Sequence, residues 1–340
     1  VAGGGTLQYS GGGGVNKIWR PSLAQGGADD DIYAVYTTAQ ADTITGDAFG
    51  NIIFTGGGKD TVSVGAGKDT VYAAGGEATS LNLGNDNDVL EAAFYKTSVT
   101  ANTSTVDGGA GTDSLQFGLT NTGWSQPGGG RQILGVDWNA VGVDLDLTTG
   151  KATGTSLLGT GNTIDFSNFE QFHLTNGADT VTVNDTVMGA LTSSNLIDAS
   201  PLRVGGIYES ATTTGYSPAG YNGANSNEKF FASNNTNIVD TIKYTGNNSI
   251  AASDFFTKGF RSFEKFDLTS STATSFAVNV DDIINLTESR TLAIDKTASS
   301  INVTITTNQG WTNTVTTNSG SQVYTFTKAN EQNVVLAITG

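Results

Sequence analysis

Residues 54–76 read FTGGGKDTVSVGAGKDTVYAAGG, and this stretch decides the fold. Two near-copies within it, GGGKDTV and GAGKDTV, lie nine residues apart. With Asp60 at the sixth position of a nonapeptide, Asp42, Asn51 and Asp69 occupy the same position in neighbouring units. Two residues later, each unit places an aliphatic residue: Ile44, Ile53, Val62 and Val71. A fixed period with an aliphatic residue in one slot indicates a structural repeat.

Each nine-residue unit offers a glycine-rich turn followed by a short strand. One such strand cannot bury its apolar face alone, whereas stacked units can. We therefore expect the four aliphatic residues to form one inward-facing column. Glycine permits positive φ and a close approach of neighbouring backbones. The turn carbonyls and the Asp carboxylates are then expected to face the gap between stacked turns, where they offer hard oxygen ligands to a cation.

The composition of the whole chain favours strands and turns. Of 340 residues, 37% are hydrophobic and 14% are charged, against about 45–50% and about 25% in ordinary globular domains. The 45 glycines are accompanied by only 4 prolines, which excludes collagen. Abundant Thr, Val and Ile favour strands, and Gly, Asn and Asp favour turns. No amphipathic helix of any length is evident, so the sequence predicts an all-β protein.

The charge balance narrows the possible partners. The chain has 32 acidic and 16 basic residues and a formal net charge of −16. This argues against nucleic acid, which needs a basic surface, and suits an oxygen-ligated cation such as calcium. There is no Cys, no apolar run long enough to span a membrane and no visible signal peptide. The chain begins at Val1 rather than Met, which indicates a processed product or a fragment.

The nonapeptide resembles the GGxGxDxUx repeat of RTX proteins, most strictly over residues 55–72. Looser matches lie at residues 26–33, 84–90, 108–116 and 176–183. The resemblance implies a parallel β-roll loaded with calcium. It also implies that ligands lie eighteen residues apart in alternate turns, so that Asp42 pairs with Asp60 and Asn51 with Asp69. The next position after Asp60 is Ala78, where the ladder of ligands is expected to end.

The resemblance implies a short roll with one or two calcium sites. The expected ligands, through carboxylates or backbone carbonyls, are Asp42, Asn51, Gly56, Gly58, Asp60, Gly65, Gly67, Asp69, Asp88 and Asp113. The alternative is that GGGKD and GAGKD are ordinary turns whose Asp side chains are solvated. For Asp30 and Asp179 that alternative is the preferred interpretation.

A second repeat occupies the C-terminal part of the chain. Residues 166–175 read FSNFEQFHLT and residues 260–269 read FRSFEKFDLT, which share the pattern F-x-x-F-E-x-F-x-L-T. Alternation along a strand places Phe172 with Leu174, and Phe266 with Leu268, on one face, so we expect core packing in a duplicated unit. The last eighty residues are also similar in pattern to modules of giant RTX adhesins. Together these features predict four segments: 1–40, 41–120, 121–235 and 236–340, with further β-solenoid or β-sandwich-like modules after the roll.

The sequence lacks the usual catalytic constellations. Its single histidine, His173, has no G-x-S-x-G or H-E-x-x-H motif to support it, and we expect it on a solvated strand face. Glu170 and Glu264 recur in the duplicated motif, whereas a catalytic pair should be unique. The prediction is therefore that the protein is not an enzyme.

The first functional hypothesis is a calcium-stabilised structural protein, secreted to a bacterial cell surface. It would be a self-assembling surface-layer, sheath or filament subunit, or an adhesin module. Its expected partners are copies of itself, with cell-surface polysaccharide as a further candidate. The uncharged C-terminal segment NVVLAITG, residues 333–340, is expected to be an open strand edge that recruits another copy. The alternative hypothesis is the non-catalytic RTX repeat region of a type I-secreted hydrolase.

Overall fold

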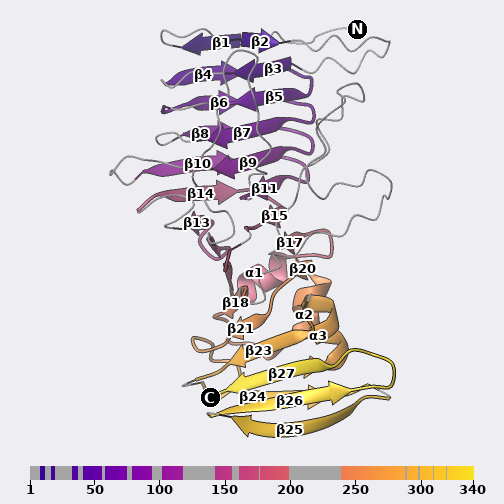
Figure 1. The fold of residues 1–340 in the computed structure, drawn as a ribbon. Helices are drawn as coiled ribbons and strands as arrows, with labels where there is room; N and C mark the ends of the chain where they lie inside the picture. Colours follow the sequence, from indigo (N-terminus) through magenta and orange to yellow (C-terminus); the bar gives the residue numbers. More distant parts are fainter. Residues whose placement is uncertain are drawn as a thin grey trace.

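The computed structural model describes residues 8–11, 17–19, 33–36, 41–55, 58–74, 79–93, 102–117, 142–154, 161–175, 177–198, 239–287, 289–297, 299–308, 310–318 and 320–340. These residues form a stack of short strands in two long sheets rich in parallel pairs, which confirms the all-β, solenoid-like prediction. The stack runs from the N-terminal to the C-terminal end of the molecule (Figure 1). Of the three predicted boundaries, 120/121 and 235/236 lie outside the described residues and 40/41 lies at the edge of an undescribed stretch. The two sheets continue on either side of each of them.

Sheet A has fifteen strands among the described residues. In spatial order they are β1 (Gln8–Gly11), β4 (Asp42–Thr45), β6 (Thr61–Ser63), β8 (Ser80–Asn82), β10 (Thr103–Asp107), β14 (Thr163–Ser167), β13 (Lys151–Thr153), β12 (Asp144–Asp146), β16 (Thr180–Val183), β18 (Thr241–Tyr244), β21 (Lys265–Asp267), β23 (Thr291–Asp295), β27 (Val334–Thr339), β26 (Ser321–Thr327) and β25 (Thr312–Asn318).

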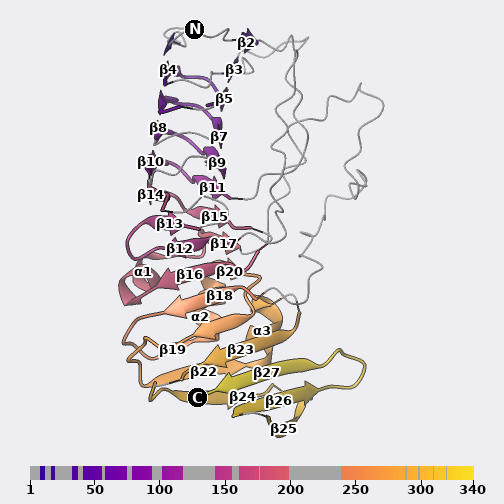
Figure 2. The same ribbon diagram turned by 60° about the vertical axis from the view of Figure 1, so that its left-hand side comes forward.

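Sheet B has nine strands in the same part of the chain. They are β2 (Lys17–Trp19), β3 (Tyr33–Tyr36), β5 (Asn51–Phe54), β7 (Thr70–Ala74), β9 (Val89–Ala93), β11 (Ser114–Gln116), β15 (Gln171–His173), β17 (Leu196–Asp198) and β20 (Phe260–Arg261). From β3 onward every pairing in this sheet is parallel. Successive strands of the roll alternate between the two sheets, so each nonapeptide is half of one coil (Figure 2).

The aliphatic slot of the nonapeptide supplies the core. Ile44 is the cross-strand neighbour of Val62 in sheet A, and Ile53 is the neighbour of Val71 in sheet B. All four side chains are buried. The expectation of one inward column is therefore wrong, because a period of nine alternates between sheets and gives two facing columns. Neighbouring residues within one column are therefore eighteen or more positions apart in the sequence.

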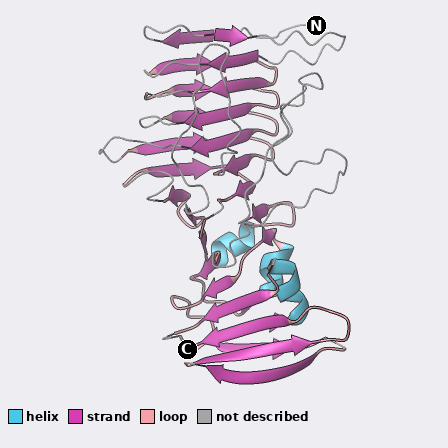
Figure 3. Cartoon of the chain, viewed as in Figure 1, coloured by secondary structure: helices cyan, strands magenta, loops and turns pink. Residues whose placement is uncertain are grey.

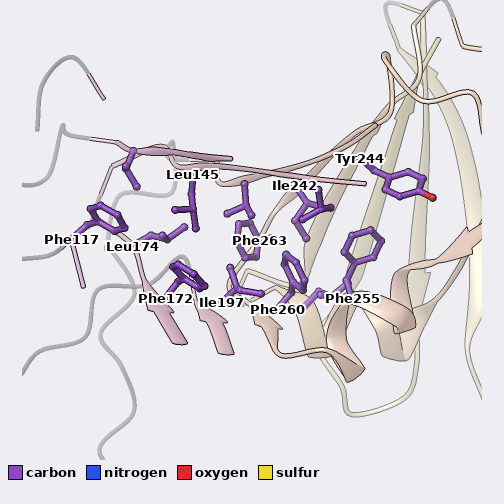
Figure 4. Packing of buried hydrophobic residues seen from close by; sticks show 14 of the residues in the cluster. Phe117, Leu145, Phe172, Leu174, Ile197, Ile242, Tyr244, Phe255, Phe260 and Phe263 are labelled. Carbon is purple, nitrogen blue, oxygen red and sulfur yellow. The ribbon is translucent and has the colours of Figure 1, made fainter. Parts of the chain in front are cut away.

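The core continues without a break into the duplicated unit. Phe172, Ile197 and Phe260 are cross-strand neighbours on β15, β17 and β20, and all are buried, as Figure 4 shows. Phe172 and Phe266 both face inward, together with Leu174 and Leu268, as alternation along the duplicated motif predicts.

Three short helices and a small sheet complete the described part of the chain (Figure 3). The helices are α1 (Asp185–Ala190), α2 (Ala252–Thr257) and α3 (Val280–Leu286), and the strands of the small sheet are β19 (Ile250–Ala251), β22 (Ser275–Asn279) and β24 (Asn302–Thr306). No helical period is visible in the sequence because these helices are only one to two turns long. α1 and α3 begin at capping residues: Asn184 and Asn279 accept the N–H groups of Val187 and Asp282.

The C-terminal strand is interior, which corrects the expectation of an open edge at residues 333–340. β27 pairs in parallel with β23 on one side and antiparallel with β26 on the other. Its residues Val334, Leu336 and Ile338 are buried. The chain reverses through β25 and β26 before β27 inserts beside β23, so the exposed edge falls on β25 instead.

Candidate cation-binding edge

The turns that lead from a sheet A strand to the next sheet B strand lie on one side of the roll, and we call this side the acidic edge. Its turns are residues 46–50, 64–69, 83–88, 108–113 and 168–170. Their backbones bond directly to each other: the N–H of Asn85 donates to the carbonyl of Gly65 at 2.9 Å, and the N–H of Ala110 donates to that of Gly84 at 2.8 Å. The turns are therefore stacked in contact, with no layer of solvent between them.

Glycine is required for this close stacking. Gly84 has φ +95°, and a Cβ added there would overlap the carbonyl oxygen of Gly65 in the preceding turn. Gly109 bears the same relation to Gly84. Gly84 and Gly109 thus allow both the left-handed backbone conformation and the close approach of the preceding turn.

A ladder of carboxylates ties the same turns together. Each carboxylate accepts the backbone N–H of its counterpart one turn earlier. Asn51 donates to Oδ1 of Asp69, Asp69 donates to Oδ1 of Asp88 at 2.8 Å, and Asp88 donates to Oδ1 of Asp113 at 2.8 Å. Asp113 then donates to Oε2 of Glu170 at 2.9 Å. The spacings of 18, 19, 25 and 57 residues show that the ladder survives insertions between turns.

The second oxygen of these Asp side chains has no hydrogen-bond partner. Asp69, Asp88 and Asp113 are at most 1% exposed, and Oδ2 of each is buried and unbonded. Burial raises the pKa of Asp69 to about 8, that of Asp88 to about 7 and that of Asp113 to about 6. A buried carboxylate oxygen without a donor is costly. A proton or a bound cation would remove this cost.

Further acidic groups reinforce this edge. Asp47 and Asp86 raise the pKa of Asp69 after the larger effect of burial, and Asp107 does the same for Asp113. Asp86 occupies the nonapeptide position of Gly58 and Gly67 and shares their positive φ, at +78°. These three Asp residues were not predicted as part of the site because none of them occupies the sixth position of the repeat.

The opposite edge carries a shorter ladder. The N–H of Asp42 donates to Oδ1 of Asp60 at 2.9 Å, both side chains are buried, and Oδ2 of Asp60 has no hydrogen-bond partner. Burial raises the pKa of Asp60 to about 7. Ala78 lies outside the described residues, and because the next unit is one residue longer, Thr79 aligns with Asp60 and brings no carboxylate to this column. Thr79 takes the ladder position, and its N–H donates to Oγ of Ser104 at 3.2 Å.

The expected ligands thus separate into two columns. Asp42 with Asp60 belongs to one edge and Asn51 with Asp69 to the other, as the eighteen-residue spacing implies. Asp88 and Asp113 extend the second column. The glycines at 58, 65 and 67 lie in the described turns, whereas the glycine at 56 and Asp30 lie outside the described residues.

The oxygen atoms of these columns suit a hard cation in kind, but they do not supply a complete set of ligands. Within the described residues, no three His, Asp or Glu side chains converge on one point. A cation would therefore take one or two carboxylates and complete its shell from backbone carbonyls, which calcium accepts. The unbonded, buried Oδ2 atoms of Asp60, Asp69, Asp88 and Asp113 are the groups that would receive it.

A third ladder in the C-terminal half is bonded differently. Val143 donates its N–H to Oδ1 of Asp179 at 2.7 Å, and Asp179 donates to Oδ1 of Asp240 at 2.7 Å. The other oxygen, Oδ2 of Asp179, accepts the N–H of Thr175 at 2.8 Å. The idea of a solvated turn Asp is wrong for Asp179, which is 1% exposed. Burial also raises the pKa of Asp179 to about 7, but both of its oxygens already accept hydrogen bonds from the protein, which distinguishes it from the Asp residues of the acidic edge.

The duplicated glutamates end the ladders. Asp240 donates its N–H to Oε2 of Glu264 at 3.2 Å, as Asp113 does to Glu170. The residue two positions earlier has positive φ in both copies, at Asn168 (+56°) and Ser262 (+64°). The shared geometry accounts for Glu in both copies of the F-x-x-F-E-x-F-x-L-T motif. Glu is longer than Asp, and it reaches the N–H of the preceding turn from a turn that contains a residue with positive φ.

His173 is buried at 5% exposure, so the expectation of a solvated face is wrong. Its cross-strand neighbour Gln116, and Glu91 beyond it, are buried as well. The outer face of sheet B is therefore covered at this level, which the alternation of the strand cannot indicate.

No protein-family model matches the chain, and a search of the curated proteins found no match either. Among the described residues, no helix has the length and apolar character needed to cross a membrane.

Proposed function

We propose that this chain is a non-catalytic, calcium-stabilised structural protein of a bacterial cell surface. The observation that carries the proposal is the set of four buried Asp carboxylates, at positions 60, 69, 88 and 113, each with an unbonded Oδ2 in a stack of glycine-rich turns. Burial disfavours the ionised form of such a carboxylate, and a cation bound beside it would offset that cost. Calcium suits them because it takes oxygen ligands in flexible geometry, backbone carbonyls included.

Calcium would act by neutralising the repulsion between adjacent turns. Asp113 raises the pKa of Asp88, and Asp88 raises that of Asp69, in addition to the larger effect of burial. Extracellular calcium modules bind with dissociation constants of about 10⁻⁴–10⁻³ M. A site of that strength is empty in a cytosol and filled outside, which suits a protein that folds after export.

The rest of the architecture supports a structural role. The described residues form two continuous sheets with one hydrophobic cluster along the stack. A long rigid body with open strand edges suits an assembly subunit or an adhesin module, for which copies of the same chain are the proposed partner.

Calcium-dependent folding and assembly test this proposal together. Circular dichroism of calcium-depleted protein, before and after addition of calcium, should show a higher melting temperature with the ion. Electron microscopy of the same samples should show ordered assemblies only with calcium. Identical melting curves and dispersed particles in both samples would contradict the proposal.

A further inference from the structure

β25 is an edge strand without the features that normally prevent pairing. Among the described strands it pairs only with β26, and all seven of its residues are exposed. Its sequence, TNTVTTN, contains no charged residue and no proline, and its register with β26 is unbroken from Thr312 to Asn318. Natural edges are usually protected by charge, proline or a bulge. The absence of charge is notable in a chain with a net charge of −16.

An apolar row leads from the core to this edge. Leu336 is fully buried, its cross-strand neighbour Tyr324 is partly buried against the core, and the neighbour of Tyr324 is Val315. Val315 is 52% exposed, and Val239 is the only other large hydrophobic residue exposed in the described part of the chain. The row therefore stops at an uncovered side chain in the middle of an open edge.

The centre of β25, Thr314–Val315–Thr316, reads the same in both directions, and the flanking positions on each side are Thr and Asn. We propose that β25 pairs antiparallel with β25 of a second copy, across a two-fold axis at Val315. Thr312 would then face Asn318, Asn313 would face Thr317, Thr314 would face Thr316, and Val315 would face its own copy. This inference rests on the proposed function in one respect: it names the strand at which copies meet.

The pairing satisfies what an isologous interface requires. The same patch serves both partners, no like charges meet, and cross-strand Thr and Val pairs are favourable. The row Leu336–Tyr324–Val315 continues into the same row of the partner, so sheet A becomes continuous through the dimer. β24 is a second uncharged edge, and β1 is the edge at the other end of sheet A; contacts through either of these are the alternative outcomes.

Two substitutions of matched residues test the joint. Val315→Lys places two ammonium groups opposite each other in the dimer and should raise its dissociation constant by roughly tenfold or more. Val239→Lys makes the same change at an exposed valine away from the edge and should leave it unchanged. Sedimentation equilibrium of the full chain, with a monomer of 35.0 kDa, measures both. Circular dichroism should show both variants folded, since each replaces an exposed side chain.

Disulfide trapping tests the register, because the chain has no cysteine of its own. Val315→Cys should form a disulfide-linked dimer under mild oxidation. Thr312→Cys should not, because the two copies of residue 312 lie about 20 Å apart in this register. A monomeric wild-type chain overturns the inference, and so do dimers that form without cross-linking through Val315→Cys. Assemblies that persist in Val315→Lys overturn the β25–β25 contact but leave the proposed function intact. A β25 dimer that forms in a chain without calcium binding supports the contact and contradicts the proposed function.

Discussion

The backbone N–H of Asp69 donates to Oδ1 of Asp88 at 2.8 Å, although the two residues are 19 positions apart in the chain. The other oxygen of Asp88 is buried and unbonded. Oδ1 of Asp88 thus joins two turns, and Oδ2 is left free to bind a proton or a cation. Because the two roles lie on different atoms of one side chain, substitutions can separate them.

Asp88→Asn should preserve the ladder and weaken calcium binding. The amide oxygen still accepts the N–H of Asp69, but the charge is lost. Asp88→Ala leaves that buried N–H without an acceptor and should cost about 1–3 kcal/mol of unfolding free energy in calcium-free buffer. Urea denaturation measures the difference. Asp165→Ala, which removes an exposed partner of Lys151, is the control and should cost less than about 1 kcal/mol. Equal losses in Asp88→Asn and Asp88→Ala would contradict the hydrogen-bonding role.

Glu170 should behave as the end of the ladder. Glu170→Gln retains the acceptor for the N–H of Asp113 and should be close to neutral without calcium. Glu170→Asp withdraws the carboxylate by one methylene and should destabilise the chain by about 1 kcal/mol. Chemical denaturation of both variants tests this, and a Glu170→Asp variant as stable as wild type would show that the length of the side chain does not matter.

Stacking of the turns should depend on glycine at specific positions. Gly84→Ala places a Cβ against the carbonyl of Gly65 at a left-handed φ and should cost several kcal/mol, of the order of other strained backbone sites (about 1–3 kcal/mol each) plus the clash. Gly189→Ala is the matched control: it lies in α1, a Cβ there meets nothing within 4 Å, and it should stabilise by up to about 1 kcal/mol. Thermal melting of both variants should therefore shift in opposite directions. A Gly84→Ala variant that melts with the wild type would exclude tight stacking at this turn.

The calcium-free protein should lose stability as pH rises. Burial raises the pKa of Asp60, Asp69 and Asp88 to about 7, 8 and 7, whereas unfolded Asp titrates near about 3.9. The folded chain holds protons that the unfolded chain has released between these values. The stabilisation is thus complete below about pH 4 and disappears by about pH 8. Urea midpoints of calcium-depleted protein at pH 5 and pH 8 should show the loss, and saturating calcium should reduce it because calcium displaces the protons. A flat profile without calcium would contradict the burial of these groups.

Much of the fold was predictable from local pattern. The nine-residue period identified Asp60 and Asp69 as equivalent positions and Val62 and Val71 as core, because turn chemistry and aliphatic spacing are encoded within a few residues. The period could not show that successive units lie in opposite sheets. The strict period also misses the spacing of 19 residues between Asp69 and Asp88, because the unit before Thr79 is one residue longer.

The non-local features could not be predicted in this way. Glu170 accepts the N–H of Asp113, 57 residues earlier in the chain, and the nine-residue period does not predict such a contact. β27 looks like an open edge in sequence, yet a chain reversal through β25 buries it between two strands. His173 is buried on the outward-facing side of its strand, where alternation predicts solvent. For Glu170 and β27, the decisive partner comes from a segment that is distant in the sequence.

Calcium binding measured by calorimetric titration tests the central claim most directly. Calcium-depleted wild-type protein and the Asp69→Asn/Asp88→Asn variant would be titrated with calcium, with magnesium as the competing ion and circular dichroism to verify that both chains are folded. We expect wild type to bind calcium with a dissociation constant of about 10⁻³ M or tighter, in preference to magnesium, and the folded variant to lose this binding at the acidic edge. Wild-type protein that binds no calcium, or a variant that binds it with unchanged stoichiometry and affinity, would show that the buried carboxylates are not a calcium site.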